Sequence, residues 1–201
     1  MRKQRKKKRR AYHVGNLREA LLKAGAELIE KKGVRALTLR EIGKRLGVSR
    51  MAAYRHFPDK AALLGAISEI GFARFAEALT EARDAHRGHF ARLEALGVAY
   101  VRFAAENRAH FQVMFGIETE APELSREGKA VADRAFATLR ETIQAGAKAG
   151  AFKVADVRAT TEAAWAIAHG ISLLGLEPDA TGKAARTRAT LKIFSRGLRR
   201  G

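Results

Sequence analysis

The sequence contains no cysteine, which excludes disulfide bonds, thiolate metal sites and a cysteine nucleophile. Proline is also rare, with 3 residues among 201, and β-branched residues form no long runs. Alanine and leucine, which favour helices, are abundant instead. This composition predicts an all-α fold, and a hydrophobic fraction of 47% is enough for a sizeable core.

Long apolar segments and catalytic motifs are missing as well. The longest mainly apolar stretch, residues 163–176, is too short to span a bilayer and contains His169. The basic N-terminus lacks the apolar segment of a secretory signal. The sequence has no G-x-S-x-G, no H-E-x-x-H and no glycine-rich phosphate loop. We therefore expect a soluble cytoplasmic protein that is not an enzyme, has no membrane partner and needs no cofactor.

Acidic residues are scarce in the first third of the chain. The formal net charge is +18, and residues 1–60 hold 19 lysines and arginines against 5 acidic residues. Residues 61–201 are nearly balanced, with 20 against 16. Solubility alone does not require such segregation, which indicates a polyanionic partner, either a nucleic acid or an acidic membrane surface.

The most basic segment is the N-terminal end, where eight of the first ten residues are lysine or arginine. It has no hydrophobic periodicity, so we expect residues 1–14 to form a disordered arm. Such an arm can lie along phosphates or enter a minor groove. A non-native extension or a merely solubilising tail is the alternative.

Three helices are predicted in residues 15–60. The first covers 17–32, with Asn16 as its N-cap and Gly33 as its stop. The second begins with a capping box, Thr38 to Glu41, and stops at Gly47.

The third helix runs from Arg50 to about Phe57, because Ser49 is a good N-cap and Pro58 prevents its continuation. The second and third helices are thus joined by a three-residue turn, which is the size expected in a helix-turn-helix. We assign residues 15–60 to a DNA-binding domain of this kind.

The remaining chain, residues 61–201, predicts a larger, aromatic-lined helical domain. Asp59 can cap a long fourth helix, and nine of the ten phenylalanines lie beyond residue 60. The helical segments are expected near residues 60–85, 90–106, 108–115, 125–148, 156–175 and 182–198.

The third helix has one face suited to a core and one suited to DNA. Ala53 and Phe57 share the face expected to pack inward. The residues expected to contact bases or phosphates are Arg40, Ser49, Arg50, Met51, Ala52, Tyr54, Arg55, His56 and Lys60. Arg50 or Arg55 can pair with guanine, and Met51 or Ala52 can touch a thymine methyl. Alternatively, Tyr54 is a core aromatic and the arginines form a solvated face.

The stretch ALTLREIGKRLGVSRMAAYRHFPDKAALL, residues 36–64, resembles the DNA-binding domain of the TetR family of transcriptional regulators. Tyr54, Phe57, Lys60, Leu64 and the turn at residues 46–49 match its pattern. The resemblance implies a bacterial, homodimeric, all-helical repressor whose C-terminal domain dimerises and binds a small effector. It also implies that Arg40, Arg50, Met51, Tyr54, His56 and Lys60 face DNA. Two features depart from the family pattern, namely the small Ala53 and the long basic arm.

A second resemblance lies in AAWAIAHGISLL, where Trp165, His169 and Gly170 are similar to the Trp-His-Gly signature of one C-terminal subgroup of that family. The stretch HFQVMFG, residues 110–116, is similar to a segment of the same subgroup.

An effector cavity is expected among the aromatic residues of the larger domain. The candidates are Phe72, Phe75, Tyr100, Phe103, Phe111, Met114, Phe136, Trp165 and His169. Trp165 and His169 can instead pack against a neighbouring helix, and Phe111 and Met114 can be plain core. His86 and His89 have metal-ligand spacing, but they flank the helix-breaking Gly88, so we predict no metal site.

We expect two chains to pair through the helices near residues 156–175 and 182–198. Their apolar residues are Trp165, Ile167, Ile171, Leu174, Leu191, Ile193 and Leu198. Pairing of this kind places two recognition helices in successive major grooves of a palindromic operator, about 34–36 Å apart. An effector would release the DNA by favouring another separation. The alternatives are a non-specific nucleoid protein, an enzyme with an unrecognised site and a membrane-surface protein.

Overall fold

The structure, a computed structural model, describes residues 17–174 and 183–199. These residues form α-helices, one short 3-10 helix and no strand, which confirms the all-α prediction. The helices are α1 Leu17–Lys32, α2 Leu39–Leu46, α3 Arg50–His56, α4 Lys60–Asp84, α5 His89–Glu106, α6 Arg108–Met114, α7 Arg126–Lys148, α8 Val157–Leu174 and α9 Lys183–Gly197. The 3-10 helix, η2, covers Val34–Ala36.

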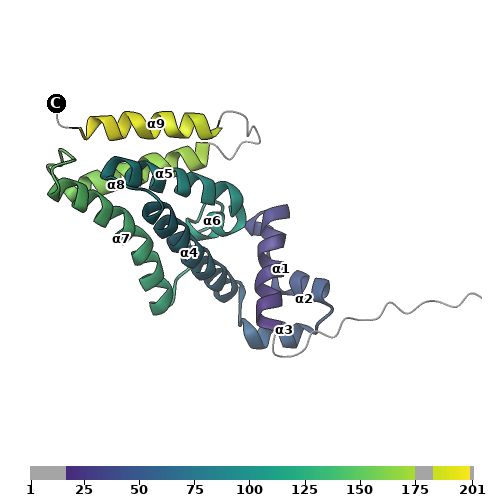
Figure 1. Cartoon of the computed structure of the whole chain (residues 1–201). Helices are drawn as coiled ribbons and strands as arrows, with labels where there is room; N and C mark the ends of the chain where they lie inside the picture. Colours follow the sequence, from purple (N-terminus) through teal and green to yellow (C-terminus); the bar gives the residue numbers. More distant parts are fainter. Residues whose placement is uncertain (1–16, 175–182, 200–201) are drawn as a thin grey trace, which may run out of the picture.

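Two groups of helices are joined by α4 (Figure 1). The small helices α1, α2 and α3 lie together at one end of the molecule, and α4 leads from them into the larger group. Helices α8 and α9 lie on the side of the larger group that is remote from α3. The site-bearing third helix and the predicted dimerisation helices are therefore at opposite ends.

Local capping fixes the bounds of the small helices. Thr38 Oγ1 accepts from the Glu41 N–H at 3.1 Å, and Ser49 Oγ accepts from the Ala52 N–H at 3.2 Å. Asp59 Oδ1 accepts from the Ala62 N–H at 2.8 Å at the start of α4. These three N-caps were predicted from the sequence and are confirmed. The fourth, Asn16, lies outside the described residues.

The first hydrophobic core holds the small helices together. It contains Leu21 and Leu28 of α1, Ile42 of α2 and Phe57 after α3, all buried. It continues into Leu63 and Ile67 of α4 and into Ala109 and Val113 of α6. The first hydrophobic core therefore extends beyond residue 60, and the first turns of α4 pack as part of the small helical group.

Two further cores fill the larger group. One is aromatic and lies between α4, α5, α6, α7 and α8; it includes Phe72, Phe75, Tyr100, Phe103 and Phe111. The other, around Ile143 and Phe152, joins α5, α7, α8 and the end of α9. A Cβ on Gly146 would lie 2.2 Å from the Phe152 ring, so glycine at this position allows the ring to pack against α7.

Candidate functional site

The turn between α2 and α3 has the geometry of a helix-turn-helix. Gly47 ends α2 in the left-handed region with φ 69°, where a side chain would be strained. The Val48 N–H donates to the Gly43 carbonyl at 3.0 Å, which closes the turn. Ser49 then caps α3. The turn therefore holds α3 at a fixed angle to α2.

Helix α3 is anchored by its inner face. Ala53 is completely buried, and Phe57, directly after the helix, is 3% exposed. The Arg18 guanidinium lies over the Phe57 ring at 5.3 Å from its centroid. Because Ala53 is small, the α3 backbone approaches α2 closely: a Cβ on Gly43 of α2 would lie 3.9 Å from the Ala53 Cβ.

The outer face of α3 projects into solvent. Met51 is 71% exposed, and Arg50 and Arg55 are also exposed. The Arg50 guanidinium lies 5.1 Å from the centroid of the Tyr54 ring, so these two side chains share one flank. Among the described residues, no carboxylate pairs with Arg50 or Arg55. Their charges are thus available to an external anion.

Four predicted DNA-facing residues are only partly exposed, namely Ala52, Tyr54, His56 and Lys60. Ala52 and Tyr54 pack against the first core from its edge, and His56 is also half-buried. Tyr54 packs against the core and also lies under the Arg50 guanidinium, and its contact with DNA stays a prediction. Arg40 and Ser49, near the N-termini of α2 and α3, are exposed.

Lys60 makes contacts that the sequence did not indicate. Its Nζ donates to the Val34 carbonyl at 2.9 Å and to the Arg35 carbonyl at 3.4 Å. Two of the three N–H donors of the Lys60 ammonium thus bind carbonyls of η2. The third can still donate a hydrogen bond to a phosphate. No sequence signal identified η2, so this bracing role was not predictable.

The two groups of helices are connected by two carboxylates. Glu118, which follows α6, accepts from the Val34 N–H at 2.9 Å through Oε2 and from Gln112 Nε2 at 3.3 Å through Oε1. Glu30 of α1 accepts from the Ala109 N–H at 3.0 Å, in the first turn of α6. Helix α6 is therefore tied to the DNA-binding end near both of its ends.

The predicted effector residues form most of the aromatic core. Phe72, Phe75, Tyr100, Phe103, Phe111 and Met114 are all buried in it. Phe136 is 38% exposed, and its ring packs on Trp165 at 5.5 Å between centroids. The Tyr100 hydroxyl forms a hydrogen bond of 2.7 Å with His169 Nδ1. The His169 ring also contacts Trp165 at 5.3 Å and Phe115 at 4.8 Å between centroids.

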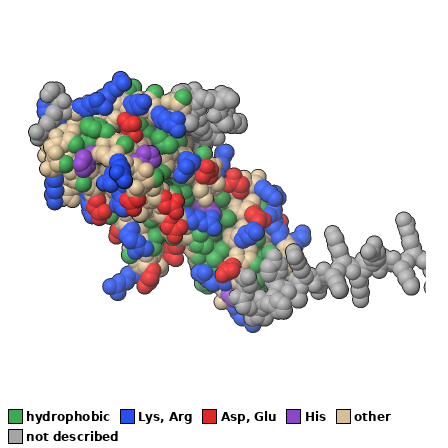
Figure 2. All heavy atoms as spheres, viewed as in Figure 1, with side chains coloured by type: hydrophobic (Ala, Val, Ile, Leu, Met, Phe, Trp, Pro, Cys, Tyr) green, Lys and Arg blue, Asp and Glu red, His purple; other side chains and the backbone are tan. Residues whose placement is uncertain are grey.

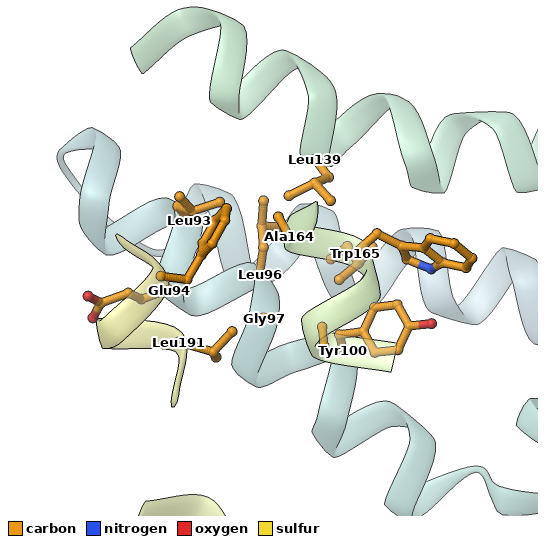
Figure 3. Close-up of a pocket in the computed structure, with 12 residues that line it drawn as sticks. Leu93, Glu94, Leu96, Gly97, Tyr100, Leu139, Ala164, Trp165 and Leu191 are labelled. Atoms are coloured by element: carbon orange, nitrogen blue, oxygen red, sulfur yellow. The ribbon is translucent and has the colours of Figure 1, made fainter. Parts of the chain in front are cut away.

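Beside this core, a narrow cavity lies between α5, α8 and α9 (Figure 3). Its volume is about 30 Å³, room for about two water molecules. Of the nine predicted effector residues, Tyr100 and Trp165 line it. The other lining residues are mostly aliphatic and include Leu93, Leu96 and Leu191. The sequence did not single these leucines out, because leucine at helical spacing is equally expected in plain core.

Burial keeps the polar groups of this region uncharged. Desolvation raises the pKa of the Tyr100 hydroxyl well above its ordinary value, and it lowers the pKa of His169. The Trp165 N–H lies near the Tyr100 oxygen and opposes part of the rise in its pKa. It does not reach hydrogen-bond geometry with that oxygen or with any other group in the described chain.

The other histidines do not form a chelating group. His86 Nδ1 lies 2.8 Å from the Ala82 carbonyl, and His89 packs edge-on against Phe152. Within residues 17–174 and 183–199, no three carboxylate or imidazole groups gather as metal ligands would. None of the helices in the same ranges is both long and apolar enough to cross a bilayer.

Comparison with known proteins agrees with this architecture. Residues 21–67 match the family model of bacterial regulatory proteins of the tetR family, and residues 93–194 match the tetracyclin repressor-like C-terminal domain. The chain therefore belongs to the TetR family, which consists of regulators and not of enzymes. The resemblance inferred from residues 36–64 is confirmed. The assignment to the Trp-His-Gly subgroup stays a prediction.

Individual relatives show how far the similarity extends. The transcriptional repressor BepR of Brucella suis biovar 1 is 34% identical over 78% of this chain and 74% of its own length. The nucleoid occlusion factor SlmA of Aliivibrio fischeri is 34% identical, but this chain spans only 52% of its length. A protein of unknown function from Rhodococcus sp. RHA1 has a TM-score of 0.82 and 32% identity, over 95% of this chain and 100% of that one.

Proposed function

We propose that the protein is a transcriptional repressor that binds a palindromic operator in double-stranded DNA as a homodimer and leaves it when a small effector binds. The observation that carries this proposal is the outer face of α3. It presents Arg50, Met51 and Arg55 to solvent while Ala53 anchors the helix from behind. Arginine fits guanine and phosphate, and an α-helix fits the major groove. The repressor BepR, similar over most of its length, supports the same reading.

The dimer is proposed to form through the outer faces of α8 and α9. Leu174 is 85% exposed and Ile193 is 72% exposed, so both leave apolar surface in water. Leu191 and Leu198, also expected at the interface, are buried within their own chain, and Trp165 packs against the aromatic core. The surface available to a partner is therefore narrower than the sequence indicated.

Gly170 gives a second reason to place a partner at α8. A glycine inside a helix costs about 1 kcal/mol relative to alanine. A Cβ at Gly170 would meet no atom of the described chain within 4 Å, so packing within those residues does not require glycine here. Close approach of a second helix would require it.

Helix α6 offers a route from effector to DNA. Its Phe111 and Met114 lie in the aromatic core, while its Ala109 and Val113 lie in the core of the small helices. A ligand that moved Tyr100, which lines the cavity and whose ring lies 6.0 Å from that of Phe111, would therefore strain the contacts of Glu30 and Glu118. We infer that this strain changes the spacing of the two α3 helices in the dimer.

Competition between DNA sequences tests the proposal. A binding site selected from random sequence should hold the protein against a large excess of random DNA, and the site should be a palindrome. Equal affinity for both DNAs would favour the second candidate, a non-specific nucleoid protein. That candidate is suggested by the excess of basic residues in the first 60 positions and by the partial similarity to SlmA. In either case we place the protein at the nucleoid.

A further inference from the structure

The indole N–H of Trp165 is a buried donor without an acceptor in the described chain. Buried polar groups in folded proteins are nearly always hydrogen-bonded, so each exception requires an explanation. Figure 3 shows the indole nitrogen on the edge of the ring that faces Tyr100. The Tyr100 oxygen, however, is engaged by His169 Nδ1 at 2.7 Å. A hydroxyl oxygen can take a second hydrogen bond, but the indole N–H does not reach hydrogen-bond geometry with the Tyr100 oxygen, so the donor has no partner in the described chain.

The cavity beside this donor favours an uncharged guest. Most of its walls are aliphatic, from Leu79, Leu93 and Leu96 among others. Neither Tyr100 nor His169 offers a full charge at neutral pH, because a phenol is protonated there in any case and burial lowers the pKa of His169 further below its ordinary value. The one charged lining residue is Glu94, whose carboxylate accepts from Ser195 Oγ at 2.9 Å and repels anions. An ionised carboxylate in this cavity would lose its hydration without gaining a partner.

We infer that this cavity binds a small uncharged molecule with an apolar body and a single hydrogen-bond acceptor, such as a carbonyl oxygen, which accepts from the Trp165 N–H. The inference rests on the proposed function, because it names the chemical class of the effector of the repressor. The acceptor lies at the Trp165 and Tyr100 end, and the apolar body lies among the leucines.

Helix α9 is the side of the cavity that we expect to move outward when the small molecule binds. The present cavity, about 30 Å³, must widen to hold even a benzene ring. Leu191 and Phe194 of α9 form one side of it. α9 is seated closely on α5, since a Cβ on Gly97 would lie 2.6 Å from Leu191. Moving Leu191 outward moves α9, and Ile193 on the same helix belongs to the proposed dimer surface. Ligand and dimer geometry are coupled through this helix.

Four probes of nearly equal shape test the inference on the full-length protein. Acetophenone has a carbonyl acceptor, cumene has none, benzoate is an anion and α-methylbenzylammonium is a cation. Calorimetry should show that acetophenone binds about tenfold more tightly than cumene. This ratio corresponds to the free energy of one neutral hydrogen bond. Benzoate should not bind measurably, and the ammonium ion, which has no acceptor for the Trp165 N–H, should bind less tightly than acetophenone. Tighter binding of benzoate or of the ammonium ion, or equal binding of acetophenone and cumene, would overturn the inference.

The single tryptophan of the chain gives a direct readout. Its one indole ¹H–¹⁵N resonance should move downfield with acetophenone and stay near its position with cumene. In Trp165→Phe, which keeps an aromatic ring but removes the donor, acetophenone should lose its advantage over cumene. Tyr100→Phe is the matched control and should keep it. If acetophenone leaves the chemical shift of the indole resonance unchanged in the wild-type protein, the inference is contradicted without relying on any variant.

Operator release is measured in parallel with the same four probes. Acetophenone that binds through Trp165 but leaves the protein on DNA would support the ligand class and refute the effector role. Release by benzoate alone would refute the ligand class and support the effector role.

Discussion

On both α3 and α8, neighbouring residues lie on different faces of the helix, one packed in the core and one directed away from it. On α3, Ala53 is buried while Met51, two residues away, is 71% exposed. On α8, Trp165 and His169 pack in the aromatic core, whereas a Cβ on Gly170 would contact no other helix of the described chain within 4 Å. Each helix therefore carries a core face and an exposed face, and substitutions on the two faces should have different consequences.

Arg50 is expected to read a base. Replacing it with alanine, Arg50→Ala, should weaken binding to the cognate site by about 1–3 kcal/mol, because a bidentate contact with guanine is lost. Binding to random DNA should change much less. Fluorescence anisotropy with both DNAs measures this, and Arg140→Ala on the exposed side of α7 removes an equal charge as the control. Equal losses on both DNAs would count against base reading.

His110 should make stability depend on pH. Burial, and then the nearby Arg74, lower its pKa to about 4, so the folded protein holds this ring neutral. The unfolded chain binds a proton near pH 6.5, and stability is therefore retained above pH 6.5 and lost as the pH falls toward 4. Between pH 7 and 5 the loss from this residue should be about 1 kcal/mol, after allowance for water that still reaches the ring. Urea unfolding of the wild type and His110→Gln at both pH values measures it. An equal loss in both proteins would contradict this account.

Helix bounds were predictable because their signals are local. Thr38, Ser49 and Asp59 cap their helices through contacts within three residues, and Gly47 ends α2 by its own conformation. The contacts that position α6 were not predictable. Glu118 reaches Val34 across 84 residues, and no periodicity or spacing indicates such a pair. The aromatic residues of the larger domain were identified, but which of them line a cavity depends on helix packing.

The link between α6 and η2 depends on Glu118. In Glu118→Ala the Val34 N–H loses its acceptor, which costs about 1–3 kcal/mol for a buried donor and less here because the contact is only partly buried. Exchange of the Val34 amide with deuterium should accelerate, and effector-induced release of DNA should weaken. Glu120→Ala, an exposed neighbour, is the control. Unchanged protection of Val34 would argue against the link.

Gly170 is proposed to lie on the dimer face of α8. Gly170→Leu should shift the protein from dimer to monomer in sedimentation velocity, because a large side chain prevents a second helix from approaching. Folding of the single chain should be unaffected, since a side chain has open space there. Ala145→Leu, on an exposed part of α7, should leave the dimer intact. A dimer that survives Gly170→Leu would place the interface elsewhere.

At the scale of the whole molecule, the distribution of charge and the shape of α3 are proposed to contribute differently to DNA binding. Lysine and arginine side chains are spread over the whole face shown in Figure 2, whereas most of the acidic ones lie in its middle. In the proposed function, the excess over the first 60 residues should add attraction to any DNA, and the outer face of α3 should give sequence preference.

The basic segment at residues 1–10 should therefore act on affinity and not on specificity. Its removal should reduce the slope of the logarithm of affinity against the logarithm of salt concentration, because fewer counterions are released from the DNA. The ratio between cognate and random DNA should stay the same. Titrations at several salt concentrations with the full-length and shortened proteins measure both quantities. A fall in that ratio would show that the segment contacts specific bases.

The most direct test of the central claim, that the outer face of α3 lies in the major groove, uses the absence of cysteine from the chain. A Met51→Cys variant carries one thiol at a position that is 71% exposed, and an iron chelate attached to it cleaves nearby DNA. Ile193→Cys, on the remote helix α9 and 72% exposed, is the matched control. The account predicts two clusters of cleavage in successive major grooves of the operator, one helical turn apart, from position 51 and none from position 193. Cleavage from both positions alike, or none from position 51 while the operator stays bound, would contradict it.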